Sequence, residues 1–211
     1  MLLSSGVTAA DASTRLRAAL AIGTAANPDL VDTLIERCAI EPDFFVRDML
    51  TWALTRLPSD LTVPRLVAEL GSGIAQARSQ ALHTLSKIGD RRTFAAITAS
   101  LLRDPDDDVA RSAWRAAVVL VPEEDRAGLA GELATQFGRG DHNVQLSLSR
   151  ALIALGAEAL EPVLSAAVKS DVPGVRAHAI ATERLLRDPN AGGELAIHEA
   201  RRQFALKDRP A

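Results

Sequence analysis

Tyrosine is absent from the 211 residues, and aromatic residues make up only 3% of the chain. There is one cysteine, Cys38, which excludes an intrachain disulfide framework and a zinc site built from several cysteines. Apolar runs are short, because a stretch such as 116–121 falls far below the ~20 residues that a membrane-spanning helix needs. These shortages exclude disulfide-rich, cysteine-rich zinc-binding and transmembrane classes.

The composition is otherwise that of a globular chain, with 47% hydrophobic and 24% charged residues. Alanine and leucine are abundant, which favours helix because alanine loses no side-chain entropy there. The net charge is −3 and the isoelectric point about 5.8, which argues against nucleic-acid binding. The stretch after Met1 lacks basic residues, so we expect no signal peptide and a reducing, cytoplasmic setting.

A sequence unit recurs along nearly the whole chain. Its most regular position is a column of arginines, replaced once by glutamine, at intervals of 31 to 34 residues: Arg15, Arg47, Arg78, Arg111, Gln145 and Arg176. Small or apolar residues follow three and six or seven positions later, on one face of an α-helix. A second apolar segment separates successive copies, so each period predicts two helices and two short turns.

Helix-boundary residues mark these turns. Aspartate, a good N-cap, stands four residues before the column at Asp11, Asp43, Asp107 and Asp141. Glycine, a good C-terminal residue, is expected to close three copies at Gly23, Gly89 and Gly156.

The pattern Asp-x-x-Val-Arg-x-x-Ala-x-x-Ala-Leu resembles the HEAT repeat family in its short bacterial form. This resemblance implies an all-α fold, a right-handed α-solenoid of about five to six helix pairs, with the pattern on the second helix of each pair. We expect one domain over residues 1–211, with helix pairs in 28–186. Capping helices are expected at about 12–23 and 193–206, because a solenoid needs a solvated outer face at each end.

The resemblance also implies that the turn aspartate and the column arginine bond between neighbouring repeats. We therefore expect a structural role, rather than anion binding, for Asp43, Arg47, Arg78, Asp107, Arg111, Asp141 and Arg176. Arginine suits this role because its planar fork of donors fits carboxylates and carbonyls. Gln145 lacks the charge and predicts a weaker junction.

In the family, the second helices line a concave surface. The positions expected to face it include a mixed group that we take as the candidate binding residues: Met49, Trp52, Arg56, Gln80, His83, Lys87 and Arg150. Tryptophan and arginine are enriched at binding hot spots, and methionine adapts to irregular partners. The alternative for Trp52 is packing against the neighbouring repeat.

Other conspicuous residues have structural interpretations. We expect Trp114 and Cys38 to be buried, and Phe44 and Phe45 to pack between repeats, with an exposed interface as the alternative for the two phenylalanines. The acidic run 104–108 lacks the ligand spacing of an EF-hand and predicts a solvated turn. The histidines lack metal-ligand spacing, and no nucleophile elbow or phosphate-binding loop is present.

These patterns favour a non-catalytic scaffold or adaptor, without metal or cofactor, that binds an acidic or helical protein segment along its concave face. HEAT-like repeats also occur in alkylpurine DNA glycosylases and phycobilin lyases, so a DNA-binding protein or a phycobilin-lyase-like ligand binder is the alternative. The glycosylase alternative is weakened by the negative net charge and the scarcity of aromatics. An apolar first helix also predicts weak self-association.

Overall fold

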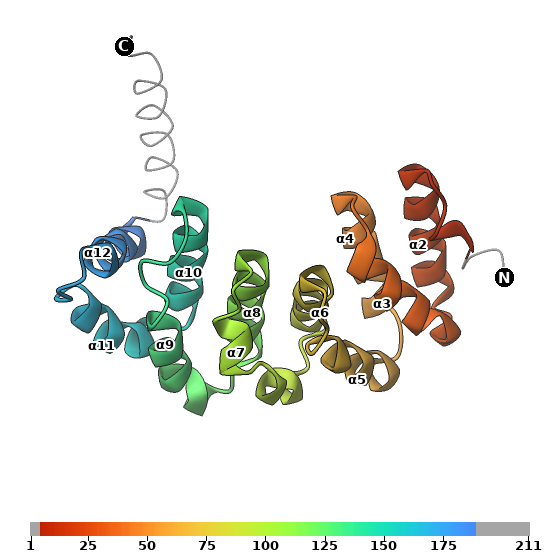
Figure 1. Cartoon of the computed structure of the whole chain (residues 1–211). Coiled ribbons are helices and arrows are strands. Elements are labelled where there is room, and N and C mark those ends of the chain that lie inside the picture. Colours follow the sequence, from red (N-terminus) through yellow and green to blue (C-terminus); the bar gives the residue numbers. More distant parts are fainter. Residues whose placement is uncertain (1–4, 189–211) are drawn as a thin grey trace, which may run out of the picture. The chain divides into compact units, whose positions relative to one another are not determined.

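Every regular element that the structure describes is helical. The structure is a computed structural model, and it describes residues 5–188 (Figure 1). The chain divides into two compact units, Met1–Glu123 and Glu124–Ala211, called unit 1 and unit 2 below.

Unit 1 begins with α2 (Ala12–Ala25), which precedes three helix pairs. The pairs are α3 with α4 (Val31–Ile40 and Phe44–Thr55), α5 with α6 (Ser59–Glu69 and Ala75–Ile88), and α7 with α8 (Ala99–Leu102 and Asp107–Leu120). Short 3-10 helices, η1 (Pro28–Leu30) and η2 (Arg91–Ala96), precede α3 and α7. In Figure 1 the second helices α4, α6 and α8 form one layer of this unit, and α3 and α5 lie in another.

Unit 2 contains two further pairs. They are α9 with α10 (Arg126–Ala134 and His142–Ala154) and α11 with α12 (Ala157–Ala167 and Pro173–Arg187), after the 3-10 helix η3 (Glu123–Asp125) at the boundary. The predicted all-α class and the solenoid-type pattern of helix pairs are confirmed in each unit. The predicted helix at 193–206 lies outside the described residues, and a single domain over 1–211 stays a prediction.

The core follows the helical period of the repeat. Leu50 and Leu54 on α4, and Leu82 and Leu85 on α6, are fully or almost fully buried. Their spacing of three or four residues places each pair on one face of its helix. Burying one such side chain stabilises the fold by roughly 1.5–3 kcal/mol, so these positions hold the second helices against their neighbours.

Aspartates begin most of the second helices. The side chains of Asp11, Asp43 and Asp141 accept hydrogen bonds from the backbone N–H three residues later, as predicted. The prediction for Asp107 is wrong, because Asp106 caps α8 by accepting from the N–H groups of Asp108 and Val109. The N–H of Asp106 is itself bound to Asp104 Oδ1, which places the cap one residue earlier than in the other copies.

Two glycines at helix boundaries have the left-handed or extended conformation with positive φ that favours glycine. Gly89 ends α6 with φ +75°, and Gly156 lies between α10 and α11 with φ +95°. Gly23 does not end its helix, since α2 continues to Ala25. A Cβ at Gly23 would lie 2.4 Å from Cζ3 of Trp52, so this glycine makes room for the indole ring.

The arginine column binds the loop that precedes each second helix. Arg47 Nη1 donates to the carbonyls of Glu41 and Pro42, six and five residues before it. Corresponding bonds reach the carbonyls of residues 9 and 10 from Arg15, of residue 72 from Arg78 and of residue 170 from Arg176. Gln145 reaches only the Gly140 carbonyl, at 3.3 Å. The column therefore fixes the turn-to-helix geometry in successive copies.

Arg15 and Arg78 of the column also join neighbouring repeats, with partners that differ from the expected aspartates. Arg15 pairs with Glu41, and Arg78 pairs with Asp104 at 3.0 Å. Both acids lie just before the cap of the next second helix. The capping aspartates Asp43 and Asp141 use a side-chain oxygen for their own helix instead.

Candidate binding groove

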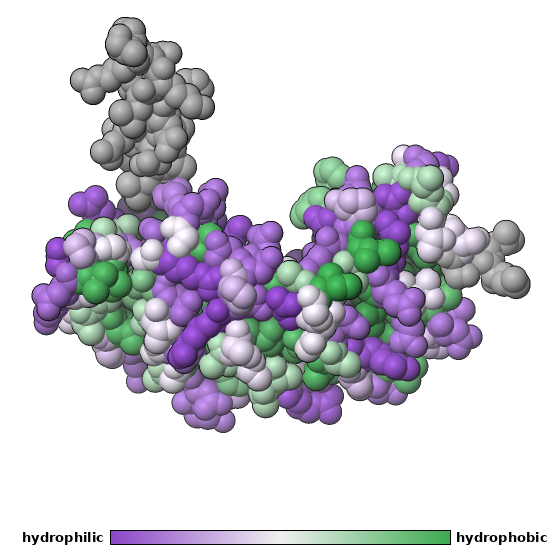
Figure 2. All heavy atoms as spheres, in the orientation of Figure 1, coloured by the Kyte–Doolittle hydropathy of each residue, from purple (hydrophilic) through white to green (hydrophobic). Residues whose placement is uncertain are grey.

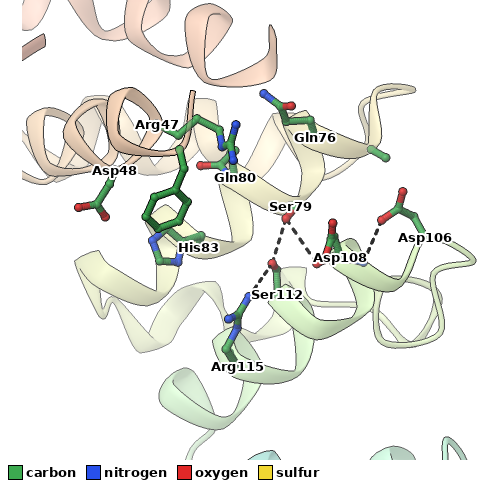
Figure 3. Close-up of a pocket in the computed structure, with 12 residues that line it drawn as sticks. Arg47, Asp48, Gln76, Ser79, Gln80, His83, Asp106, Asp108, Ser112 and Arg115 are labelled. Atoms are coloured by element: carbon green, nitrogen blue, oxygen red, sulfur yellow. Dashed lines mark hydrogen bonds between the residues drawn. The ribbon is translucent and has the colours of Figure 1, made fainter. Parts of the chain in front are cut away.

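Three consecutive second helices of unit 1 form the walls of a groove of about 470 Å³ (Figure 3). Polar, charged and aromatic side chains from α4, α6, α8 and the turn before α8 line it: Phe44, Arg47, Asp48, Ala75, Gln76, Ser79, Gln80, His83, Asp106, Asp108, Ser112 and Arg115. All these residues belong to unit 1. Its position on the second-helix layer matches the surface that the sequence predicts for binding.

The groove contains part of the predicted set. Gln80 and His83 line it, and Figure 3 shows both on the same helix beside Ser79. Met49, Trp52, Arg56 and Lys87 do not line this groove. Lys87 borders a separate hollow at the far ends of α4 and α6, Arg56 is the exposed residue that follows α4, and Met49 is half-buried.

Trp52 has an intermediate environment. Its ring lies against Gly23 of α2, while 36% of the residue remains exposed. The packing alternative for Trp52 therefore describes one side of the ring. Arg150 lies on α10 in unit 2 and is exposed there.

Arg115 and Asp48 are groove residues that sequence reasoning missed. The concave face was expected at the second, fifth and ninth positions after the arginine column. On α8 these positions are Ala113, Ala116 and Leu120, and all three are fully buried. The helix instead presents Arg115, a charged residue in an alanine- and valine-rich run. That isolated charge was the available signal, because a guanidinium is not placed in a packed apolar face without a partner.

A chain of hydrogen bonds holds the α8 wall of the groove. Arg115 Nη2 donates to Ser112 Oγ at 3.2 Å, the Ser112 and Ser79 hydroxyls are 2.9 Å apart, and Ser79 Oγ donates to the Asp108 carbonyl at 3.4 Å (Figure 3). Since Ser112 accepts from Arg115 and Ser79 donates to a carbonyl, the Ser112 hydroxyl donates to Ser79. This direction fixes Arg115 against the wall and joins α6 to α8.

The groove combines opposite charges. Burial lowers the pKa of His83, Lys87 and Arg115 lower it further, and Asp48 opposes them. Burial likewise lowers the pKa of Arg115, with a second contribution from Arg111. His83 is therefore a neutral group near neutral pH, between an acidic side chain on α4 and a basic one on α8.

Phe44 and Phe45 form an aromatic rim at the start of α4. Their rings make an edge-to-face pair with centroids 5.6 Å apart, and the Arg47 guanidinium carbon lies 6.0 Å from the Phe44 centroid. The prediction that they pack between repeats is wrong, because 66% and 71% of these residues are exposed. They precede Val46, the first buried residue of α4, and so lie outside its apolar face.

Other predicted core residues are confirmed. Trp114 is fully buried, and its Nε1 donates to the Leu102 carbonyl at 2.8 Å, which joins α8 to α7. Cys38 is buried on α3, and burial raises the pKa of its thiol to about 12. Such a thiol is a small hydrophobic group rather than a nucleophile.

Unit 2 contains a buried serine and histidine in contact, with Ser149 Oγ 3.0 Å from His178 Nε2. The Gly138 N–H donates to His178 Nδ1, so the ring proton is on Nε2, which also lies 2.9 Å from the Gln145 carbonyl. His178 is therefore a donor at Nε2 and cannot take a proton from Ser149. The contact is structural, and Ser149 is in turn bound to Thr182.

Within residues 5–188, no group of three or more histidine, cysteine or acidic side chains is placed to hold a metal ion. In that same span, none of the helices combines the length and apolar character needed to cross a membrane.

No protein-family model matches the chain, and neither does any curated protein. Three solved structures illustrate what the fold is similar to. An engineered protein is 18% identical over 88% of this chain and 96% of that chain, with a TM-score of 0.49. The CpcE–CpcF complex of phycocyanin lyase from Nostoc sp. PCC7120 is 19% identical, with coverages of 88% and 76% and a TM-score of 0.49. Human deoxyhypusine hydroxylase in complex with glycerol is 16% identical, with coverages of 93% and 88% and a TM-score of 0.47.

Proposed function

We propose that this chain is a non-catalytic interaction module of the HEAT-repeat type, which binds a segment of a partner protein along the groove of α4, α6 and α8. The observation that supports this most directly is the groove itself. Successive repeats each contribute side chains to one continuous hollow of about 470 Å³. A stack of helix pairs presents such an extended surface as a consequence of its repetition.

The chemistry of the lining supports a protein ligand. The exposed ring of Phe44 lies at one wall, with Phe45 packed edge-to-face against it, and amide, hydroxyl and charged groups occupy the others. This combination of aromatic residues, arginine and adaptable polar groups is typical of protein interfaces. A nucleic acid is a poorer match, because carboxylates at Asp48, Asp106 and Asp108 would repel its phosphates.

The absence of catalysis is part of the proposal. His83 is the histidine of the groove, and its pKa is lowered by burial. A neutral imidazole near Arg115 and Lys87 suits recognition by hydrogen bonding. We place the module in a reducing cytoplasm, in keeping with the buried, unpaired Cys38.

Site-specific photo-crosslinking tests this function. A photoreactive amino acid replaces Gln80 in the groove, and in a control protein it replaces Arg65, a 63% exposed side chain on α5 outside the groove. Both full-length proteins are irradiated in nuclease-treated native extract, and adducts are identified by mass spectrometry. We expect a protein adduct at position 80 that is absent at position 65.

The same adduct should disappear when His83→Ala and Arg115→Glu are added to the position-80 protein. Identical adducts from positions 80 and 65 would place binding outside the groove. Adducts with nucleic acid in untreated extract, without a protein adduct in either extract, would favour the DNA-binding alternative.

A further inference from the structure

Arg115 is a cation without an acidic partner. It is held by Ser112, and among the described residues none provides a carboxylate that pairs with its guanidinium. Asp108, whose charge acts on Arg115, is already paired with Arg111 at 3.5 Å. Arg115 is an exposed residue that lies near a second arginine, Arg111, so an added anion relieves the repulsion between the two cations.

The surroundings of Arg115 fix where that anion binds. Its Nη2 donates to Ser112, and the Ser112–Ser79 contact holds this wall in place, so the guanidinium is held at the wall of the groove that Arg115 lines (Figure 3). Asp48 on α4 raises the pKa of His83, and Arg115 on α8 lowers it. The α4 wall carries Arg47 as well as Asp48, and the α8 wall carries Asp108 as well as Arg115, so an added carboxylate is matched by Arg115 itself and not by the whole α8 wall.

The other recognition element is apolar. Figure 2 shows hydrophobic residues at the surface of unit 1 over α4, among hydrophilic ones. Phe44 and Phe45, at the start of α4, are an exposed aromatic pair, and their edge-to-face geometry holds two rings ready at low entropic cost. Phe44 lines the same groove as Arg115, so a single bound segment reaches both.

We infer that the occupant of the groove is a protein segment that places an aspartate or glutamate carboxylate on Arg115 and an aromatic or large aliphatic side chain against Phe44 and Phe45. This inference rests on the proposed function and adds the chemistry of the partner. The carboxylate supplies charge complementarity, and the apolar residue covers the exposed rings. An acidic segment without an apolar residue leaves the aromatic rim in water and binds less tightly.

Selection from a displayed library of random 12-residue peptides tests this inference on the full-length protein. Parallel selections use wild type, Arg115→Glu, Phe44→Ser with Phe45→Ser, Gln80→Arg, and the matched control Arg65→Glu. Wild type and Arg65→Glu should enrich the same peptides, which carry an acidic residue at a fixed separation from an aromatic or large aliphatic one. Arg115→Glu should lower the affinity for these peptides by about tenfold or more, since it replaces attraction of the peptide carboxylate by repulsion.

A charge swap separates recognition from damage to the fold. For the strongest peptide, a version with lysine in place of its acidic residue should bind Arg115→Glu better than wild type. Phe44→Ser with Phe45→Ser should weaken the original peptide by about tenfold while leaving the preference for acid intact. Thermal unfolding of all variants should remain cooperative, with midpoints lowered by no more than the loss of one exposed hydrogen bond or ion pair explains.

The possible outcomes distinguish failure of this inference from failure of the proposed function on which it rests. Peptides that lose binding in Gln80→Arg but show no acidic residue and no response to Arg115→Glu would overturn the inference and leave the groove a binding site. Peptides that bind all groove variants equally, or a library that yields no binder, would overturn the inference and also count against the proposed function.

Discussion

Glu41 binds Arg15 through both carboxylate oxygens, with Arg15 Nε 2.7 Å from Oε2 and Arg15 Nη2 2.8 Å from Oε1. Arg37 Nε also donates to Oε2, and the Asp43 N–H donates to Oε1. The carboxylate of Glu41 is completely buried. One side chain thus joins α2 to the loop that begins α4.

Replacing Glu41 should therefore destabilise unit 1 strongly. Glu41→Gln keeps the size but leaves the buried charge of Arg15 uncompensated, which typically costs about 3–5 kcal/mol. Urea unfolding followed by tryptophan fluorescence measures this. The control is Asp32→Asn, because Asp32 and Arg65 form an exposed pair that should contribute less than about 1 kcal/mol. Equal losses in the two variants would show that the buried pair has no special role.

The same carboxylate predicts a loss of stability in acid. Burial acts to raise the pKa of Glu41, but the bonds from Arg15, Asp43 and Arg37 outweigh it and hold the pKa at about 2, below its ordinary 4.5. The unfolded chain takes up this proton at higher pH than the folded one. The contribution is therefore complete above about pH 4.5 and is lost as the pH falls toward 2.

Urea midpoints between pH 6 and pH 2.5 test this expectation. The decline should be shallower in Glu41→Gln than in wild type. Asp90→Asn is the comparison for an acid outside the Glu41 cluster whose pKa is lowered mainly by its hydrogen bonds with Arg92. Parallel curves for wild type and Glu41→Gln would assign the acid sensitivity to other carboxylates.

Gly23→Ala should destabilise unit 1 although alanine favours helix. The new methyl group would meet the Trp52 ring at 2.4 Å and the Ala53 Cα at 2.9 Å, and the backbone of α4 cannot move aside as a side chain can. Overpacking of this kind costs about 1–3 kcal/mol. Gly131→Ala on α9 meets nothing within 4 Å and should stabilise by up to about 1 kcal/mol. A Gly23→Ala protein as stable as wild type would show that α2 shifts without cost.

His178 predicts a second pH effect, in unit 2. Burial lowers the pKa of His178, and the neutral ring accepts the Gly138 N–H at 3.0 Å. The unfolded chain therefore binds the proton at higher pH, so this contribution is complete above about pH 6.5 and is lost as the pH falls below it. The Gly138 amide should exchange with solvent faster at pH 5.5 than its chemical exchange rate alone predicts.

Histidine variants assign this effect. His178→Asn should remove the extra exchange at Gly138, whereas His83→Gln, which removes a histidine from unit 1, should leave it unchanged. If His83→Gln removes it instead, the titrating group is not the one beside Gly138.

The sequence predicts the helix pairs well because the repeat carries local information. Asp43 and Asp141 are capping residues within their own helices, and Leu50 or Leu82 is apolar at a regular spacing, so neither prediction depends on distant contacts. The arginine column recurs at a regular spacing that the sequence shows, but its acidic partners could not be chosen. Glu41 and Asp104 lie in irregular turns, where spacing gives no geometry.

The groove residues were harder to predict, because which side chains of a helix face the groove depends on how the helix is rotated about its own axis. On α6, Gln80 and His83 line the groove at two of the positions expected to face it. On α8 the expected positions are buried, and Arg115, one position before the expected Ala116, lines the groove instead. Phe44 and Phe45 were assigned to packing because aromatic residues are usually buried. Their exposure follows from their place in the first turn, before the core face begins.

The two tryptophans of the chain both lie in unit 1, with Trp114 sealed between α7 and α8 and Trp52 partly open beside α2. Tryptophan fluorescence therefore reports on the unfolding of unit 1 and not on that of unit 2, whereas circular dichroism reports on the helices of both units. Overlaying the two signals during denaturation measures, without labels or truncation, whether the units melt together. If the fluorescence transition precedes the loss of ellipticity, unit 1 unfolds first. If the two transitions coincide, the two units unfold together as one cooperative unit.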